Sequence, residues 1–381
     1  MVADRLIRFD DIERCTRPVK SEFAVLALVT DAFGGHGGMA QYNRDFFGAL
    51  VNRGLVSSLI VLPRYAPNEV VTSALVRQLA PRAGRASYVV AAIREALFRP
   101  IDMVFCGHLY MASLALLIAR LKQAKLIIQM HGYEAWQRPT WHCRRAVEAA
   151  NFVLCVSRYT RAQVLNWAAI APERVLVLPN TVGAIFTPGD GSKLRTAWGL
   201  QGKRVLLSVA RMSAQERYKG HDRVIRAIPK LVEDGHDVVY VVVGEGDDRT
   251  RLQLLAEKEG VAGRVYFIGA LEPVMLVDAY RMADLFVMPS TGEGFGIAFL
   301  EAMACGTPAL GLAVGGAVDV LAEGGLGKAV KEHDFISALE QALDQGKPRT
   351  ADFITAVQSR FGRMQFGARA IAALLRLRET A

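Results

Sequence analysis

Short apolar runs alternate along the chain with longer stretches in which apolar residues recur at helical spacing. The runs have the length of strands and are mostly apolar, as in strands buried on both faces of a parallel sheet. Because the alternation restarts in the second half, the chain predicts an α/β fold with two doubly wound domains. The expected strands span residues 23–29, 56–62, 101–106, 125–129, 151–156 and 174–180, then 204–209, 238–243, 264–269 and 285–288.

The domain boundary is expected at residues 187–193, where glycine, proline and polar residues cluster. This boundary predicts an N-terminal domain of residues 1–190, a second domain of residues 191–358 and a C-terminal segment of residues 359–381. Residues 1–20 show no clear periodicity and are interpreted as an extension. A cluster of this composition can also act as a hinge, so we expect the domains to close on a ligand.

The composition is that of a globular protein, with 52% apolar and 22% charged residues among 381. No stretch reaches the roughly 18 apolar residues that a membrane span requires, and the first residues lack the apolar core of a signal peptide. The five cysteines form no C-x-x-C pair, which argues against a disulfide framework or a zinc ribbon. A cytoplasmic protein is therefore expected.

The positive charge is concentrated in the first half of the chain. Residues 1–190 carry 22 Lys and Arg against 14 Asp and Glu, so this half accounts for +8 of the net charge of +9. An anionic membrane surface or a nucleic acid could use such a charge, and a merely well-solvated basic surface would also explain it. The basic residues are dispersed and form no recognisable nucleic-acid motif, so we expect peripheral contact with an anionic membrane and no nucleic acid.

Two carboxylates eight residues apart dominate the candidate chemistry. Glu293 and Glu301 lie in the segment PSTGEGFGIAFLEAMACG, residues 289–306. If a helix starts near Gly296, Glu301 lies about one turn in, and both side chains can point into one cleft. Glycines let the backbone approach a ligand, and the first N–H groups of a helix favour phosphates or hydroxyls. The alternative is that both glutamates merely cap and solubilise an ordinary strand-to-helix connection.

Other candidates follow the ends of expected strands. Arg211 and Lys219 flank a loop after residues 204–209, and two permanent cations beside helix N–H groups suit a diphosphate. In isolation, two surface cations are the simpler interpretation. Residues 31–38 form a glycine-rich loop between a strand and a helix, which could cradle a phosphate or could be a tight turn. His108 and His131 each follow a buried strand, where a histidine can serve a ligand or be structural.

The segment 289–306 resembles the E-x7-E signature of retaining nucleotide-sugar glycosyltransferases of family four, which have the GT-B fold. The similarity includes the preceding Pro289-Ser290 and the following EAMACGTP, and it extends over the chain after residue 22. It implies two Rossmann-like domains that face each other across a cleft, an acceptor-binding N-terminal one and a C-terminal one for the nucleotide sugar. It also implies that the last helical segment, residues 361–377, crosses back to the first domain.

The resemblance assigns roles to individual residues. Glu293 would hold hydroxyls of the donor sugar and stabilise the charge that develops there, and Glu301 would accept the ribose hydroxyls. His131 would lie against the transferred sugar, as a second catalytic candidate. Arg211 and Lys219 would hold the donor diphosphate, although Ala210 replaces the glycine that usually precedes the Arg. The remaining donor-binding candidates are Gly37, Gly38, Gly244, Ile268, Gly294, Phe295 and Gly296, while His36, His108 and Glu134 are weaker candidates for ligand contact.

The implied reaction is hexose transfer with retention of the anomeric configuration. The segments ERYKGHD and DAFGGHGGMAQYNRDFF resemble those of bacterial exopolysaccharide mannosyltransferases, which favours GDP-mannose as donor and a lipid-linked oligosaccharide as acceptor at the inner face of the cytoplasmic membrane. No two aspartates stand two apart as a metal-binding triplet would require, so neither a metal nor another cofactor is expected. The alternatives are a UDP-sugar donor, a nucleotide-sugar epimerase of similar fold, and a non-catalytic binder of anionic ligands or nucleic acid.

Overall fold

The computed structural model describes residues 22–35, 37–66, 70, 73–322, 325–347 and 351–379. The expected extension at residues 1–20 and His36 therefore lie outside the described residues. The chain divides into two compact units: unit 1 contains the chain up to Thr181 and again from Arg363, and unit 2 runs from Val182 to Gly362. The first division thus lies before the cluster at residues 187–193, and the last segment belongs with the first half.

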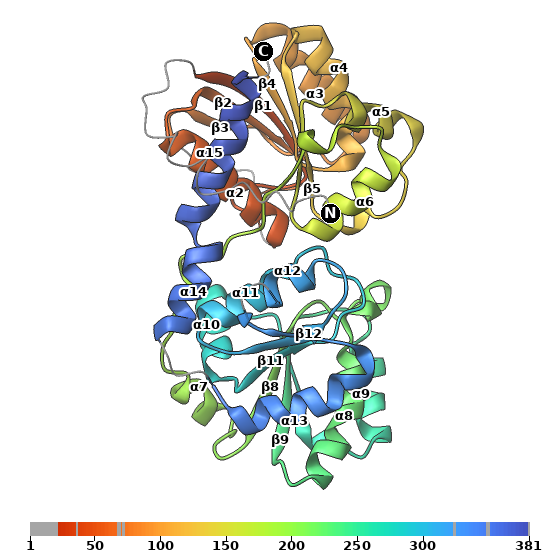
Figure 1. The fold of residues 1–381 in the computed structure, drawn as a ribbon, viewed down its shortest axis with the longest axis vertical. Helices are drawn as coiled ribbons and strands as arrows, with labels where there is room; N and C mark the ends of the chain where they lie inside the picture. The colour runs from red at the N-terminus through yellow and green to blue at the C-terminus, as the bar shows by residue number, and fades with distance from the viewer. Residues whose placement is uncertain are drawn as a thin grey trace. The chain divides into compact units, whose positions relative to one another are not determined.

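Unit 1 is built on a seven-stranded parallel sheet (Figure 1). The strands are β1 (Phe23–Val29), β2 (Val56–Pro63), β3 (Val76–Gln78), β4 (Met103–Cys106), β5 (Lys125–Met130), β6 (Phe152–Cys155) and β7 (Val175–Val177). Their order in the sheet is β3-β2-β1-β4-β5-β6-β7. The chain thus reverses its direction across the sheet between β1 and β4, and such a point is where doubly wound sheets bind ligands.

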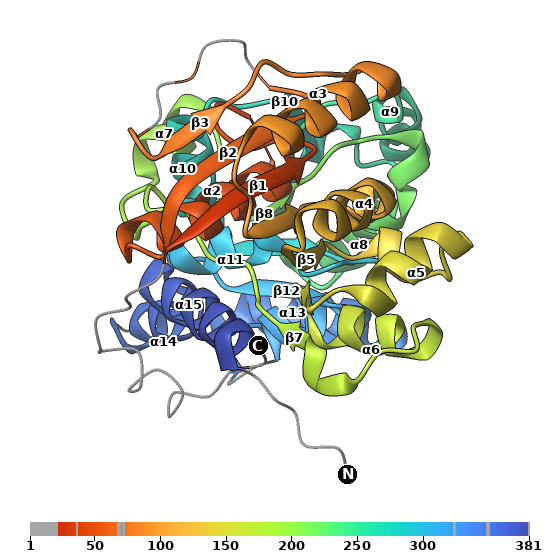
Figure 2. The same cartoon turned by 90° about the horizontal axis from the view of Figure 1, so that it is seen from above.

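Helices cover both faces of this sheet, which explains why its strands are apolar on both sides. One face carries α3 (Arg85–Phe98), α4 (Ala112–Lys122), α5 (Trp141–Ala149) and α6 (Arg158–Trp167), packed on residues such as Leu28 and Val104. The other carries α2 (Gly38–Asn52), whose Phe46 stacks on Phe105 with ring centroids 4.9 Å apart. The final helix, α15 (Arg363–Glu379), packs against α2 (Figures 1 and 2).

Unit 2 repeats this plan with a six-stranded parallel sheet of order β10-β9-β8-β11-β12-β13. The strands are β8 (Arg204–Val209), β9 (Val238–Val243), β10 (Val265–Gly269), β11 (Leu285–Met288), β12 (Ala309–Leu312) and β13 (Lys328–Val330). The helices are α7 (Ser192–Ala197), α8 (His221–Glu233), α9 (Arg249–Lys258), α10 (Pro273–Met282), α11 (Ile297–Ala304), α12 (Ala317–Leu321), α13 (Phe335–Gln345) and α14 (Ala351–Phe361). The direction of winding reverses between β8 and β11. Two Rossmann-like sheets confirm the α/β fold class.

Short 3₁₀ helices complete the described chain: η2 (Leu109–Met111), η3 (Tyr133–Ala135), η4 (Pro172–Arg174), η5 (Ala214–Lys219), η6 (Ala262–Arg264) and η8 (Glu332–Asp334). The helical segment expected at residues 361–377 is two helices, because α14 ends at Phe361 and α15 begins at Arg363. A Cβ on the intervening Gly362 would lie 2.4 Å from the Gln358 carbonyl oxygen. In the described part of the chain, no helix combines the length and the apolar character needed to cross a membrane.

Candidate active site

In unit 2, the reversal between β8 and β11 brings together an ion pair. Lys219 ends the loop that follows β8, Glu293 lies in the loop that follows β11, and the Lys219 Nζ donates to Glu293 Oε2 at 2.8 Å. Both side chains are largely buried. Burial alone would lower the pKa of Lys219, but the attraction of Glu293 and this hydrogen bond outweigh it, so the pKa is raised. Lys219 therefore stays charged at neutral pH.

Backbone contacts fix these two loops against each other. The Thr291 N–H donates to the Tyr218 carbonyl at 2.9 Å, and the Gly316 N–H donates to the Glu293 carbonyl at 2.7 Å. Gly220 adopts a φ of +82°, and a Cβ there would lie 2.4 Å from the Pro289 carbonyl oxygen. Only glycine suits this combination of close approach and left-handed backbone. The ion pair thus sits in a framework that both loops share.

Glu301 lies on the first turns of α11, as the spacing predicted, because the helix starts at Ile297 with Gly296 as its N-cap. Gly296 has a φ of +92°, which glycine adopts without strain. The Tyr280 hydroxyl from α10 donates to Glu301 Oε2 at 2.7 Å. Burial raises the pKa of Glu301 to about 7, despite the opposing effect of this hydrogen bond. Oε1 accepts no hydrogen bond from any described residue, so it can accept one from a ligand hydroxyl.

The residues between the two glutamates differ in what they can offer a ligand. Phe295 is 2% exposed, and its ring packs edge-on against Phe361 with centroids 5.8 Å apart. Its side chain belongs to the core, so only its backbone could contact a donor. Gly294 is partly exposed, and α11 begins without a side-chain cap. The first N–H groups of α11 are therefore available to an anionic or hydroxyl-rich ligand.

Arg211 is the second cation near this sheet edge. Its side chain is 76% exposed, and it donates to Glu216 Oε1 at 2.6 Å within the same loop. An exposed pair of this kind contributes little to stability, so the guanidinium can exchange its partner for a phosphate at small cost. Arg211 and Lys219 thus belong to the same connection between β8 and α8, as the sequence suggested.

The ends of β9 and β10 present backbone rather than side chains. Gly244, with a φ of +136°, donates through its N–H to the Gly269 carbonyl at 2.8 Å. A Cβ on Gly244 would lie 2.2 Å from the Ala210 carbonyl oxygen, so the loop after β8 passes directly beside it. Ile268 falls at a register irregularity between Phe267 and Gly269. A bulge of this kind takes Ile268 out of the regular pairing with β9, which frees backbone groups for another partner.

In unit 1, His131 follows β5 in a largely buried position. Its Nε2 lies 3.1 Å from the Gly107 carbonyl oxygen, which can only accept, so Nε2 carries the proton and Nδ1 is an acceptor. The ring meets Tyr42 edge-on with centroids 5.4 Å apart. Burial lowers the pKa of His131 to about 4, against the opposing effect of Glu134. The imidazole is therefore neutral at physiological pH and serves a ligand as a hydrogen-bonding group.

Glu134 and His108, which lie near His131, have structural roles. Glu134 accepts a hydrogen bond from the His131 backbone N–H. The His108 Nδ1 accepts one from the Tyr110 N–H at 3.4 Å, and burial lowers the pKa of His108. His142 and Cys143 lie on α5, where the Cys143 Sγ is 3.8 Å from the Ser113 Oγ of α4. Among the described residues, no group of three His, Cys, Asp or Glu side chains is placed to hold a metal ion.

Gly37 and Gly38 lie at the start of α2, at the reversal between β1 and β4. Gly37 is the N-cap with a φ of +87°, and Gly38 is the first helical residue. Arg44 of α2 fixes the preceding loop, because its guanidinium donates to the Ala32 and Gly35 carbonyls at 2.7 Å each. These contacts present the N-terminus of α2 as a second place where backbone N–H groups can meet an anion.

Sequence reasoning missed several residues of these sites. Tyr280 positions Glu301 from 21 residues away, and the Gly315-Gly316 turn holds the backbone of Glu293. Behind Lys219, the buried His221 Nδ1 lies 3.0 Å from the Tyr240 hydroxyl, which donates to Ser208 Oγ at 2.8 Å. No local pattern marks these contacts, because each joins segments that are distant in the sequence.

Comparison with known protein families shows which family this chain belongs to. The model described as "Glycosyl transferases group 1" matches residues 192–359, and that described as "Glycosyltransferase Family 4" matches residues 36–183. The chain belongs to the family-four glycosyltransferases. The two matches together span most of the chain: one covers β2 to β7 of the first sheet and the other covers all six strands of the second. The resemblance to the family-four glycosyltransferases is thereby confirmed over residues 36–183 and 192–359.

Curated relatives of this family-four member act on different compounds. It is 33% identical over 223 residues to a D-inositol 3-phosphate glycosyltransferase of Acidothermus cellulolyticus, covering 53% of this chain and 49% of the relative. It is 31% identical over 248 residues to a GDP-mannose-dependent alpha-(1-6)-phosphatidylinositol monomannoside mannosyltransferase of Mycolicibacterium smegmatis, covering 61% and 63%. The matches thus span about half to somewhat under two thirds of these relatives.

Solved structures confirm the GT-B fold. HepE of Anabaena, crystallised with UDP, aligns with a TM-score of 0.73 over 94% of this chain and all of that one, at 17% identity. Sucrose-phosphate synthase of Thermosynechococcus elongatus aligns with a TM-score of 0.68 over 93% of this family-four chain and 98% of its own, at 20% identity. At these identities the likeness concerns the fold alone.

Proposed function

We propose that this protein is a retaining hexosyltransferase that uses a nucleotide sugar. The observation that carries the proposal is the Lys219–Glu293 pair at the β8–β11 reversal, with Arg211 in the same connection. Transfer requires a diphosphate to leave the anomeric carbon while positive charge grows on the sugar ring. Arg211, Lys219 and the start of α11 stabilise the leaving group, and Glu293 faces the sugar. These groups supply the charge without a metal or another cofactor.

The proposed reaction retains the anomeric configuration. We propose departure and attack on the same face of the sugar, so that the leaving phosphate accepts the proton of the acceptor hydroxyl and the configuration is retained. Glu301 takes the ribose hydroxyls through Oε1, and the backbone near Gly244 and Ile268 lines the nucleoside. His131 is proposed as a hydrogen-bonding group for the sugar. Gly37 and Gly38 offer N–H groups to donor or acceptor. This division of roles requires no covalent nucleophile.

The proposed donor is GDP-mannose and the proposed acceptor is a lipid-linked oligosaccharide of exopolysaccharide biosynthesis. A GDP-mannose-dependent relative that acts on a lipid-linked mannoside supports this choice. The alternative is a UDP-sugar, which is supported by structural neighbours crystallised with UDP and UDP-glucose. A lipid-linked acceptor places the protein on the inner face of the cytoplasmic membrane, in peripheral contact through the basic first half of the chain.

A ligand screen tests the donor. The thermal midpoint of the purified protein is measured with GDP, UDP, ADP and GDP-mannose, each with and without EDTA. A ligand at a hundredfold excess over its Kd stabilises the folded state by about 2.7 kcal/mol, which gives a clear shift. We expect the largest shift with GDP compounds and no effect of EDTA. A selective shift with UDP would replace the donor, and no shift with any nucleotide would overturn the proposed function.

Donor binding is also expected to depend on pH through Glu301. The raised pKa of about 7 means that this carboxyl is mostly protonated at pH 6 and ionised at pH 8. Since the carboxylate is the form that accepts two ribose hydroxyls, donor affinity should rise about tenfold over this range if only that form binds. Isothermal titration with GDP-mannose is the suitable measurement, because its diphosphate diester does not titrate here.

Two variants separate this effect from other titrating groups. Tyr280→Phe removes the hydrogen bond that favours the ionised form of Glu301, so the midpoint of the affinity profile should move to higher pH. Glu301→Gln should abolish the profile. A wild-type affinity that is constant between pH 6 and pH 8 would show that Glu301 does not bind the donor in its ionised form.

A further inference from the structure

Three neighbouring helices of unit 1, α3, α4 and α5, carry large apolar side chains on their outer surface, which we call the three-helix face. Their inner sides pack on the sheet in one core, so their outer sides point away from it (Figure 2). The apolar residues on the outer side are Val89, Val90, Leu97, Phe98, Leu117, Leu121 and Trp141. Phe98 is 79% exposed and Val90 67%. A concentration of this kind indicates an interaction surface.

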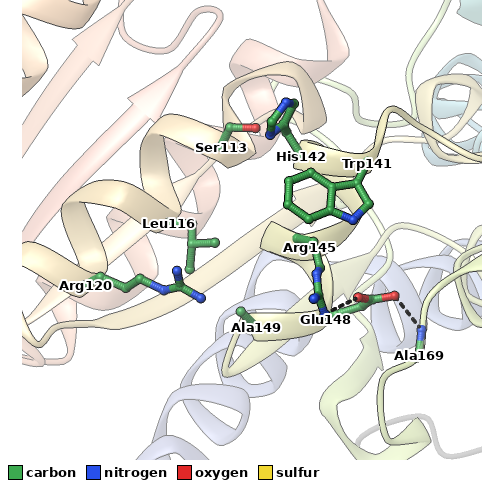
Figure 3. Close-up of a pocket in the computed structure, with 9 residues that line it drawn as sticks. All are labelled: Ser113, Leu116, Arg120, Trp141, His142, Arg145, Glu148, Ala149 and Ala169. Atoms are coloured by element: carbon green, nitrogen blue, oxygen red, sulfur yellow. Dashed lines mark hydrogen bonds and ion pairs between the residues drawn. The ribbon is translucent and has the colours of Figure 1, made fainter.

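A cavity of about 710 Å³ opens on this face between α4 and α5 (Figure 3). Its lining includes Arg120, Arg145, His142, Trp141 and Ser113. The Arg145 guanidinium lies over the Trp141 ring, 5.6 Å from its centroid, and reaches Glu148 only at 4.0 Å. Arg120 forms no ion pair with any described residue. Glu148 also lines the cavity and accepts a hydrogen bond from the Ala169 N–H at 3.1 Å. Two arginines outnumber this carboxylate, and together with the Ser113 hydroxyl and the Trp141 ring they suit a phosphate group attached to an apolar body.

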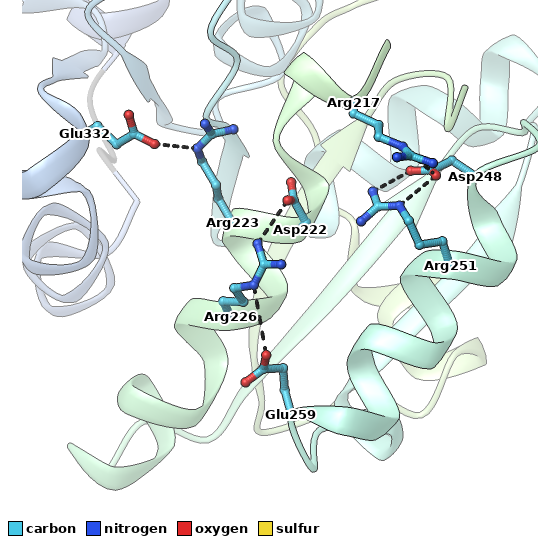
Figure 4. Close-up of polar contacts among 8 residues, drawn as sticks. All are labelled: Arg217, Asp222, Arg223, Arg226, Asp248, Arg251, Glu259 and Glu332. Carbon is cyan, nitrogen blue, oxygen red and sulfur yellow. Dashed lines mark hydrogen bonds and ion pairs between the residues drawn. The ribbon is translucent and has the colours of Figure 1, made fainter. Parts of the chain in front are cut away.

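The charges of the three-helix face are of one sign. Glu95 and Glu148 are the acidic residues of these three fully described helices, and their side chains are only 6% and 13% exposed. Arg85, Arg94, Arg120 and Arg145 are exposed. Surface arginines of unit 2 differ: Arg226 pairs with Asp222 at 3.0 Å, and Arg217 and Arg251 both reach Asp248 (Figure 4). On the three-helix face, Arg94 pairs with Glu95 at 3.4 Å and Arg145 with Glu148 at 4.0 Å, so the two glutamates neutralise only part of the basic charge and an excess of positive charge remains.

We propose that the three-helix face docks on an anionic phospholipid bilayer, with a headgroup phosphate in the cavity between α4 and α5. Nucleic acid would satisfy the arginines but would leave Leu97 and Phe98 exposed to water, whereas a bilayer accepts both. Trp141, beside the cavity, has the amphipathic ring that suits the membrane–water interface. The inference rests on the proposed function for its membrane context and specifies the surface, but lipid binding does not require catalysis.

The test is co-sedimentation of the full chain with phosphatidylcholine vesicles prepared with and without phosphatidylglycerol. We expect binding to the anionic vesicles alone, and weaker binding as salt rises. Arg120→Ala should weaken it about fivefold, because one basic side chain near an anionic surface contributes on this scale. Phe98→Ser should also weaken it, with a loss that persists at high salt. The matched control, Arg226→Ala, changes an ion-paired arginine of unit 2 and should leave binding unchanged.

The remaining outcomes overturn the proposal. Equal binding to both kinds of vesicle, or equal losses in Arg120→Ala and Arg226→Ala, would exclude a specific anionic-lipid surface. Loss of oligonucleotide binding in Arg120→Ala together with normal vesicle binding would assign the face to nucleic acid.

The thermal shift with nucleotides separates the docking proposal from the proposed function. Vesicle binding without any nucleotide shift would leave the docking surface standing and reject the transferase.

Discussion

Replacing Glu293 with glutamine is expected to lower turnover about 10²- to 10³-fold, the usual cost of removing one group that stabilises developing charge. The amide has nearly the same shape, and its oxygen can still accept the hydrogen bond that Lys219 donates to Glu293. The loop should therefore remain folded, while the negative charge next to the sugar is lost. Release of GDP from GDP-mannose, measured in the presence of a lipid extract as acceptor, gives the rate.

The control for this variant is Glu332→Gln, which neutralises an exposed carboxylate paired with Arg223 at 2.8 Å in the same unit. It should retain turnover and thermal stability. If Glu293→Gln also retained turnover within a few-fold, Glu293 would have no catalytic role. A protein that only binds anions through its basic surface would keep its affinity for them in both variants, which separates that alternative from an enzyme.

Gly220→Ala is expected to destabilise the folded state by about 2–4 kcal/mol, as strained backbone and a steric clash add together. A Cβ at this position would lie 2.4 Å from the Pro289 carbonyl oxygen, and the φ of +82° is one that alanine rarely adopts. The backbone of the loop carrying Lys219 would have to move away from β11. Urea unfolding of the variant, followed by tryptophan fluorescence, measures the loss.

The matched control is Gly235→Ala, just beyond the other end of α8. Gly235 has a similar φ of +91°, but its Cβ would meet nothing within 4 Å. It should therefore show only the cost of the backbone conformation, about 1 kcal/mol. Equal losses in the two variants would mean that the loop after β8 yields easily, and that its contact with Pro289 does not fix Lys219.

The framework of the fold could be predicted from the sequence because it depends on local patterns. Apolar runs located β1, β8, β9 and β11, and the glycine spacing placed the start of α11 within one residue of Ile297. The three-residue β3 was missed, since its sequence Val76-Arg77-Gln78 has the mixed polarity of an edge strand. Short strands of this kind carry too little apolar sequence to be distinguished from loops.

The candidate site could be predicted only in part. The cations and carboxylates of unit 2 were found because their types and spacing follow a family pattern, although their roles stay predictions. The partner of each was not predictable: Glu301 is held by Tyr280, and Lys219 by Glu293, through contacts that depend on tertiary packing. Likewise, Phe295 looks like a ligand contact in the sequence, but its ring fills the core against Phe361.

The packing of α15 on α2 affects how the chain is made. Phe366 meets Tyr42 edge-on with ring centroids 5.4 Å apart, and Arg363 pairs with Asp45 at 3.0 Å, so the last helix completes the first unit. On the ribosome, domains generally fold as they emerge, N-terminal first. Here the α2 surface around Tyr42 stays uncovered until all of unit 2 has been synthesised. The first half of the polypeptide therefore reaches its final packing only after the whole of unit 2, residues 182–362, has been translated.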